Sequence, residues 1–127
     1  MVPRRNVRLL CADDNPDISR MLTLVLEGSG YDVDVAGNGR AALNNISRDL
    51  SRYGAVITDM RMPGMDGFEL ISQSRAAGFQ GPFIVLAAAL SPDDRQMLRE
   101  MRVSRILDKP SRPATILDAV QETLAGF

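Results

Sequence analysis

Short apolar runs alternate with amphipathic stretches along the whole chain. Five runs have the aliphatic, partly β-branched composition of buried strands, and glycine, proline or polar residues bound them. The strands predicted from these runs are residues 7–12, 32–36, 55–58, 83–86 and 106–107. Because a stretch with helical spacing follows each run, the pattern favours strands that alternate with helices.

The first helical stretch begins at a polar cap. Asn15 precedes Pro16, and proline suits the first helical position because the N–H that it lacks has no partner there. Apolar residues then recur at the spacing of one helical face, and the predicted inward face is Ile18, Met21, Leu22 and Val25.

Four further helices are predicted on the same grounds. Asp66 and Ser91 are the expected caps of the third and fourth helices, and Pro113 opens the fifth. The residues expected to face the core are Ala42, Leu43, Ile46 and Leu50 in the second helix, Phe68 and Ile71 in the third, Met97, Leu98 and Met101 in the fourth, and Ile116, Leu117, Val120 and Leu124 in the fifth.

Five strands that alternate with five helices predict an α/β fold of one domain over residues 1–127. We expect a doubly wound, five-stranded parallel sheet with helices on both faces, since right-handed crossovers leave few topologies. Of the two common strand orders we expect the flavodoxin-like order 2-1-3-4-5, in which the ligand crevice lies at the carboxyl ends of the first and third strands.

Composition and charge exclude several classes of protein. The net charge of −1 argues against nucleic-acid binding through the whole surface. No apolar run approaches the ~18 residues of a membrane span, so we expect no membrane insertion and a cytoplasmic location. The chain has no histidine, which excludes histidine-based triads and metal sites with histidine ligands, and its one cysteine, Cys11, cannot form an internal disulfide.

Charged residues follow three of the predicted strands. Asp13 and Asp14 follow the first strand, Asp59 ends the third, and Lys109 follows the fifth. The predicted topology brings all four to one rim of the sheet, where crowded carboxylates need a cation. Hard oxygen ligands without histidine or cysteine point to Mg²⁺, and a neighbouring ammonium indicates a phosphoryl or other anionic group.

Each of these residues also has an ordinary structural explanation. An aspartate pair before a helix often only caps it, and an aspartate at a strand end often only forms a turn. Lys109 is the single lysine among fifteen basic residues, and the other fourteen are arginine. Since the charged groups fall at matching ends of three strands, we favour the functional interpretation for the set.

These residues resemble the receiver domain of two-component response regulators, and the resemblance covers nearly the whole chain. It rests on Asp13-Asp14, on the stretch DMRMPGMDG from Asp59 to Gly67, and on Lys109-Pro110. The central stretch has every fixed residue of that family's D-x-x-M-P-x-M-D-G pattern. The resemblance implies a domain that is not an enzyme beyond catalysing its own phosphorylation and dephosphorylation.

The resemblance implies a role for each residue of the site. Asp59 would accept a phosphoryl group from a histidine kinase or a histidine phosphotransfer protein. Asp14, Asp59 and the backbone carbonyl of Arg61 would hold Mg²⁺ or Mn²⁺, with Asp13 acting largely through water. Lys109 would contact the phosphoryl group, and the Lys109–Pro110 bond would be cis.

The chain departs from the family pattern at two positions that carry the switch. Ala87 stands where the family usually has threonine or serine, and Ile106 stands where it usually has tyrosine or phenylalanine. The backbone N–H of Ala88 would still reach the phosphoryl group. We therefore expect phosphorylation of Asp59 with a weaker or rerouted long-range response.

Two side chains would control access to the phosphoryl group. These are Arg61 and Ala89, two residues after Asp59 and Ala87 respectively. Ala89 is too small to position a water, whereas Arg61 is large and cationic. We expect slow autodephosphorylation.

Two other functions are compatible with parts of the sequence. Ala87 and Ile106 favour a pseudo-receiver, an interaction module that works without phosphate. A Mg²⁺-dependent phosphohydrolase with an aspartyl nucleophile would place an acid two residues after Asp59, and Arg61 there disfavours it.

Two helices carry faces that suit partners. One hypothesis is a homodimer through helix 4, strand 5 and helix 5, in which basic residues of one chain face acidic residues of the other. The basic residues are Arg95, Arg99 and Arg102 on the fourth helix, with Arg105 nearby, and the acidic residues are Asp118 and Glu122 on the fifth helix. The alternative is two solvated faces with weak charge pairs. The face of the first helix near Ile18, Met21 and Leu22 is where this family docks kinases, although we expect most of these residues in the core.

Overall fold

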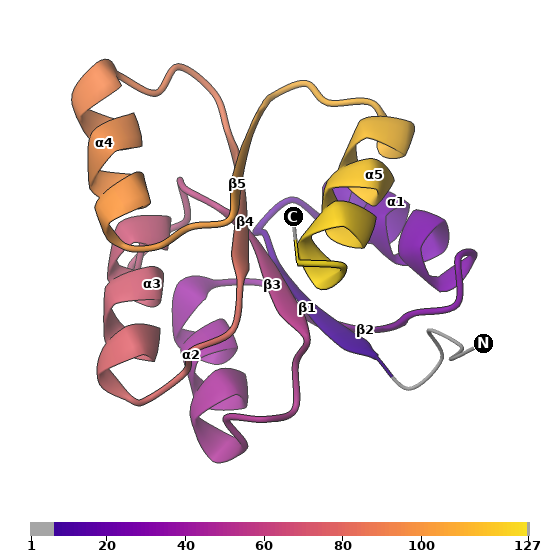
Figure 1. Ribbon diagram of the computed structural model, residues 1–127, viewed down its shortest axis with the longest axis horizontal. Coiled ribbons are helices and arrows are strands. Elements are labelled where there is room, and N and C mark those ends of the chain that lie inside the picture. The colour runs from indigo at the N-terminus through magenta and orange to yellow at the C-terminus, as the bar shows by residue number, and fades with distance from the viewer. Residues whose placement is uncertain (1–6, 127) are drawn as a thin grey trace.

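The computed structural model describes residues 7–126, so Met1–Asn6 and Phe127 of the predicted domain lie outside the described residues. Five strands alternate with five helices (Figure 1). The elements are β1 (Arg8–Ala12), α1 (Pro16–Glu27), β2 (Asp32–Ala36), α2 (Gly39–Arg48), β3 (Ala55–Asp59), α3 (Gly67–Ala76), β4 (Phe83–Ala87), α4 (Pro92–Glu100), β5 (Arg105–Asp108) and α5 (Pro113–Leu124).

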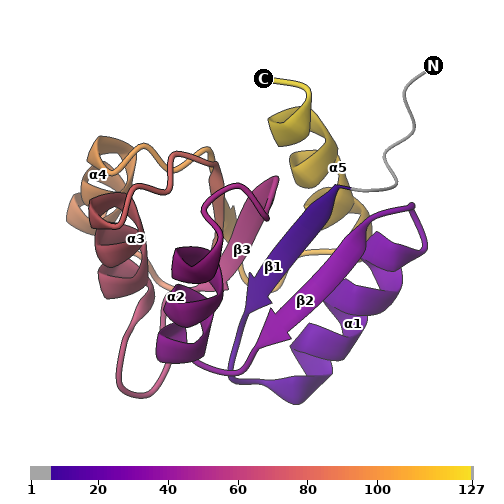
Figure 2. The same cartoon turned by 90° about the horizontal axis from the view of Figure 1, so that it is seen from below.

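The strands form one parallel sheet in the order β2-β1-β3-β4-β5, which confirms the predicted fold class and topology. Helices α1 and α5 cover one face of the sheet, and α2, α3 and α4 cover the other (Figures 1 and 2). Because every strand is parallel, all five carboxyl ends lie at one rim. This rim carries the site described below.

Each face of the sheet has its own apolar core. Leu22 and Leu26 of α1 pack with Ile116 and Val120 of α5 on one side. On the other side, a larger cluster joins α2, α3 and α4 to the sheet through Ile46, Ile71 and Leu98, among others. The central strand β3 is buried along its whole length, which gives the site a rigid base.

Side-chain caps begin four of the five helices. The predicted caps Asn15, Asp66 and Ser91 are confirmed, and each accepts a backbone hydrogen bond from the first turn of its helix. Asn38 does the same for α2. No helix within residues 7–126 is both long and apolar enough to cross a membrane.

Three predictions about the core were wrong in detail. Leu50 lies beyond the end of α2 and is 40% exposed, because the helix stops at Arg48. Met97 is 48% exposed, since α4 presents only Leu98 as a buried side chain. In α1 the buried stripe is Ser19, Leu22 and Leu26, while Ile18, Met21 and Val25 lie at its border and are half-buried.

Candidate functional site

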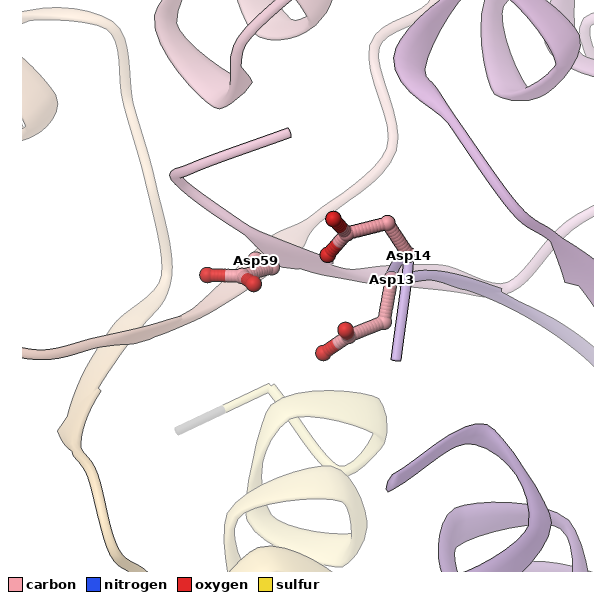
Figure 3. Close-up of side chains that lie close together, drawn as sticks. All are labelled: Asp13, Asp14 and Asp59. Atoms are coloured by element: carbon pink, nitrogen blue, oxygen red, sulfur yellow. The ribbon is translucent and has the colours of Figure 1, made fainter. Parts of the chain in front are cut away.

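Three carboxylates meet at the carboxyl ends of β1 and β3. One oxygen each from Asp13, Asp14 and Asp59 lies within 4.8 Å of the others. Figure 3 shows Asp13 and Asp14 projecting from the end of β1 toward the Asp59 side chain at the end of β3. The two strands pair with each other through Leu9–Ala12 and Ala55–Thr58, and this register sets the separation.

Asp59 is held by the backbone of the loop that follows it. Its Oδ1 atom accepts hydrogen bonds from the N–H groups of Met60 at 2.7 Å and Arg61 at 3.3 Å. Its Oδ2 atom lies 3.0 Å from the Nζ atom of Lys109. Three donors therefore orient the Asp59 carboxylate, and the residue is only 8% exposed.

The loop after Asp59 needs glycine at two positions. Gly64 has φ of +80°, a left-handed conformation that glycine adopts without steric cost. A Cβ at Gly67 would lie 2.6 Å from the Sδ atom of Met60 and 2.8 Å from the carbonyl oxygen of Asp59. Asp66 then caps α3 by accepting from the N–H of Glu69, as predicted.

Asp13 is the most deeply buried acid of the group. Its Oδ1 atom accepts from the N–H of Asn15 at 2.9 Å, whereas Oδ2 has no hydrogen-bond partner within residues 7–126. Burial raises the pKa of Asp13, and the neighbouring carboxylates of Asp59 and Asp14 raise it further, while the Asn15 N–H and the Lys109 ammonium oppose the shift. The unpaired oxygen is 3.7 Å from the Nζ atom of Lys109.

These donors fit a small divalent cation. Hard carboxylate oxygens at close range, one of them buried without a hydrogen bond, are the ligands that Mg²⁺ or Mn²⁺ takes in proteins. Asp14 is exposed and Asp13 is buried, so the cluster opens to solvent on one side.

Lys109 reaches the acids because β5 pairs with β4. Ala87 lies opposite Asp108 in the register, and the carbonyl of Ala87 accepts from the N–H of Lys109 at 2.9 Å. The Lys109–Pro110 bond is cis, as expected. The sole lysine of the chain therefore lies beside Asp13 and Asp59.

Ala87 and Ile106 share one face of the sheet. Both belong to the core on the α2, α3 and α4 side, where Ala87 is 1% exposed and Ile106 is partly buried. Within this core neither side chain offers a hydroxyl or an aromatic ring to the site. Ala88 and Ala89 follow as exposed residues, and Ala89 has φ of +55°.

A cavity of about 720 Å³ lies over the site. The predicted residues Asp59, Arg61, Ala88, Ala89 and Lys109 all line it. Sequence reasoning did not assign Met62, Phe68, Leu90 or Asp94 to this site, although they line the same cavity. Their apolar or capping character gave no signal of a binding role.

A second, mostly apolar cavity of about 480 Å³ lies between α1 and the start of α5. Ile18, Met21 and Ile116 contribute to it, and Lys109 and Ala88 line both cavities. The half-buried residues of α1 therefore form one wall of a hollow beside the acidic site.

Comparison with known families decides the assignment. The model of the response regulator receiver domain matches residues 9–121. The chain belongs to this family. The identification agrees with the resemblance inferred from Asp13, Asp14, Asp59 and Lys109.

Relatives of the receiver domain differ in length. An uncharacterized 14.6 kDa protein from the sodA1 3′ region of Leptolyngbya boryana is 36% identical over 94% of this chain and 91% of its own. The DNA-binding response regulator MtrA of Mycolicibacterium smegmatis is 33% identical over 92% of this chain and 50% of MtrA. The sensor histidine kinase RcsC of Salmonella typhi is 32% identical over 96% of this chain and 12% of RcsC.

Solved structures agree with the fold. The chemotaxis response regulator CheY4 of Vibrio cholerae superimposes with a TM-score of 0.83 and 30% identity, covering 92% of this receiver domain and 98% of CheY4. This likeness confirms the flavodoxin-like arrangement.

Proposed function

We propose that this receiver domain accepts a phosphoryl group on Asp59 in a two-component phosphorelay, in a step that requires Mg²⁺ or Mn²⁺. The donor would be the phosphohistidine of a histidine kinase or of a histidine phosphotransfer protein. The observation that carries the proposal is the position of the Asp59 carboxylate, 3.0 Å from the Lys109 ammonium and within 4.8 Å of the Asp13 and Asp14 oxygens.

The proposed step is a displacement at phosphorus. A carboxylate oxygen of Asp59 bonds to phosphorus as the P–N bond of phosphohistidine breaks, and its electron pair returns to the imidazole nitrogen, which takes a proton from solvent. The backbone N–H groups of Met60 and Arg61 fix the carboxylate, and Lys109 pairs with the transferred oxyanion. Asp13, Asp14, Asp59 and the Arg61 carbonyl would hold the cation, which supplies charge that offsets the crowded anions.

The direct test uses acetyl phosphate as donor and intact-mass spectrometry as readout. We expect one phosphoryl group on the wild-type chain with Mg²⁺ and none in excess EDTA. Asp59→Asn is the matched variant because it keeps the shape of the side chain and removes the nucleophile. A folded wild-type sample that stays unmodified with Mg²⁺ and donor would refute the proposal.

The pseudo-receiver is the second candidate, and Ala87 and Ile106 favour it. Neither side chain can make the hydrogen bond or the ring movement of the family's usual switch. The two functions differ in the mass experiment, since a pseudo-receiver carries no phosphoryl group. They also differ in partner binding, which would be the same with and without the donor for a pseudo-receiver.

We infer that the phosphorylated form is long-lived. Arg61 and Ala89 line the cavity over Asp59. The methyl group of Ala89 is too small to position a water for attack at phosphorus, and the Arg61 side chain is large and cationic enough to cover the site or bind the phosphoryl group. Loss of the added mass should therefore be slow after the donor is removed. A half-life of seconds would contradict this inference.

We also propose a homodimer through α4, β5 and α5, with basic α4 of one chain against acidic α5 of the other. Within one chain Arg95 pairs with Asp108 and Arg105 pairs with Glu122, so these charges have intramolecular partners that compete with the dimer. Exposed Arg99 and Asp118 remain available. Arg102, which was predicted on the fourth helix, lies beyond its end at Glu100, and its side chain donates to Gln80. Sedimentation at low salt with and without donor tests this, and a monomer in both states would reject it.

A further inference from the structure

Helix α4 is attached to the domain by few side chains. Among its nine residues, all of which the structure describes, Leu98 alone is buried. Arg95 of α4 pairs with Asp108, but both side chains are substantially exposed and such pairs contribute little. In Figures 1 and 2, α4 lies at the outer end of its layer, beside α3. A helix with so little buried surface moves at low cost.

Arg75 of α3 binds the carboxyl end of α4. The Nε atom of Arg75 donates to the carbonyl of Met101 at 3.4 Å, and its Nη2 atom donates to the carbonyl of Arg102 at 3.1 Å. Its Nη1 atom donates to the carbonyls of Phe79 at 3.0 Å and Gly81 at 2.7 Å. Carbonyls at the end of a helix lack hydrogen-bond donors within the helix, and Arg75 supplies donors to the carbonyls of Met101 and Arg102.

The Arg75 guanidinium is itself fixed by the core. Its Cζ atom lies 5.1 Å from the ring centroid of Phe83 and 6.0 Å from that of Phe79. Both rings are buried and meet edge to face. The planar fork is thus held over two aromatic rings while it reaches four carbonyls, a geometry that the point charge of lysine does not reproduce.

The turn that Arg75 holds is also conformationally unusual. Arg102 has φ of +62°, in the left-handed region that glycine normally occupies at a helix end. The turn closes through the Arg102 N–H to the Arg99 carbonyl and the Val103 N–H to the Leu98 carbonyl. A non-glycine residue keeps this conformation where its surroundings hold it, and the Arg75 bond to the Arg102 carbonyl is one such restraint.

The amino end of α4 borders the proposed phosphorylation site instead. Leu90 and Asp94 line the cavity over Asp59, and a capping box between Ser91 and Asp94 makes the first turn one unit. The segment that leads into it passes through Ala89, whose φ is +55°. No side chain of this first turn is buried.

We propose that α4 pivots about its carboxyl end, with Arg75 as the fixed point, when the site at Asp59 changes. The amino-terminal turn would move with the segment from Ala88 to Ser91, and the turn at Arg102 would stay in place. By this movement, a chain with alanine at position 87 and isoleucine at position 106 would transmit the state of the Asp59 site to its outer face. The regulatory half of the inference rests on the proposed phosphorylation of Asp59.

Amide hydrogen exchange by NMR tests the fixed point in the unphosphorylated protein. Four hydrogen-bonded amides report on the two ends of the helix: Arg95 on the amino end, and Met101, Arg102 and Val103 on the carboxyl end. In Arg75→Gln we expect the three carboxyl-end amides to exchange at least about tenfold faster, and Arg95 to stay within about threefold. Arg99→Gln is the control, because Arg99 lies in α4 and, within residues 7–126, its side chain hydrogen-bonds to Gln96 alone.

The same amides test the pivot after phosphorylation, with intact mass to measure the modified fraction. In the wild type we expect exchange at Arg95 to change by more than about threefold while the carboxyl-end amides change less than about twofold. In Arg75→Gln the change should extend over all four. The amide of Cys11 in buried β1 reports on global unfolding, and Arg75→Lys replaces Arg75→Gln if the latter does not fold.

Each outcome decides one part of the inference. Carboxyl-end amides that exchange as in the wild type in Arg75→Gln or Arg75→Lys overturn Arg75 as the fixed point. Equal changes at both ends of wild-type α4 on phosphorylation overturn the pivot. A chain that accepts no phosphoryl group overturns the proposed function and the regulatory half together, whereas the unphosphorylated samples still decide on the fixed point.

Discussion

The Nζ atom of Lys109 lies 3.0 Å from the Oδ2 atom of Asp59, the shortest ammonium–carboxylate approach at the site. The corresponding distance to Asp13 is 3.7 Å. Lys109 is therefore closer to Asp59, the proposed nucleophile, than to Asp13. The Asp13 oxygen near Lys109 is Oδ2, which has no hydrogen-bond partner within residues 7–126. In both ion pairs the positive charge of Lys109 offsets part of the repulsion among the three carboxylates.

Removing the ammonium should slow phosphorylation. A hydrogen bond to a charged group changes an equilibrium by roughly ten- to a hundredfold, so we expect Lys109→Gln to react about that much more slowly with acetyl phosphate and Mg²⁺. Lys109→Arg keeps the charge in a planar group, so its phosphorylation rate should lie between those of the wild type and Lys109→Gln. The time course of intact mass measures all three, and a wild-type rate in Lys109→Gln would contradict the role of Lys109.

A hydroxyl at the end of β4 should strengthen the response. We expect phosphorylated Ala87→Thr to show larger amide shift changes in α4 and β5 than the phosphorylated wild type, because the hydroxyl can bond the phosphoryl group. Ala87→Val has the same shape without the hydroxyl and is the control. Since Ala87 is 1% exposed, either variant should lose about 1–3 kcal/mol of unfolding free energy. Equal shift changes in the two variants would exclude a role for the hydroxyl.

Gly67 should be intolerant of a side chain. Its added Cβ would meet the backbone oxygen of Asp59 at 2.8 Å, so Gly67→Ala has to displace the residue that carries the nucleophile. We expect a loss of about 1–3 kcal/mol in unfolding free energy and slower phosphorylation. Gly37→Ala is the matched control, because its Cβ meets nothing within 4 Å. Urea unfolding measures both, and equal stabilities would show that the loop relaxes freely.

Asp34 of β2 should give the domain a pH-dependent component of stability. Burial by itself raises the pKa of Asp34, but hydrogen bonds from Tyr53 and Arg52 and the charge of Arg8 outweigh it and hold the pKa below its usual value. A lowered folded-state pKa stabilises the fold above the unfolded pKa of about 3.9, and this stability is lost as the pH falls through the lower value.

We therefore expect Asp34→Asn to cost about 1–2 kcal/mol at neutral pH, and the difference from the wild type to shrink as the pH falls below about 4. Asp32→Asn is the control, since its carboxylate is 55% exposed and 3.7 Å from Arg8. Thermal unfolding from acid to neutral pH measures the three proteins. A constant difference over the whole range would mean that the Asp34 charge is not the cause.

The sequence allowed the acidic rim to be predicted because charge at the end of an apolar run is visible in the chain. Asp13 and Lys109 follow strands, and Asp59 ends one, and the alternating pattern already indicated the parallel order of these strands. Proximity then followed from topology.

The rest of the structure depended on contacts without a sequence signature. Arg75 binds four backbone carbonyls, and a carbonyl is present at every position of a chain. The exposure of Met97 depended on how far α4 lies from the sheet, and periodicity gives a helical face without its distance from the core. Leu50 continued the helical spacing of α2 beyond the residue where the helix ends.

The bond from the Lys109 N–H to the Ala87 carbonyl has a consequence for how such domains diversify. The bond joins main chain to main chain, so it places the lysine whatever side chain position 87 carries. Under the proposed function, capture of the phosphoryl group and transmission of its presence would therefore be separable traits. A substitution at position 87 in the buried strand β4 would then alter what the domain communicates and leave Lys109 in its place.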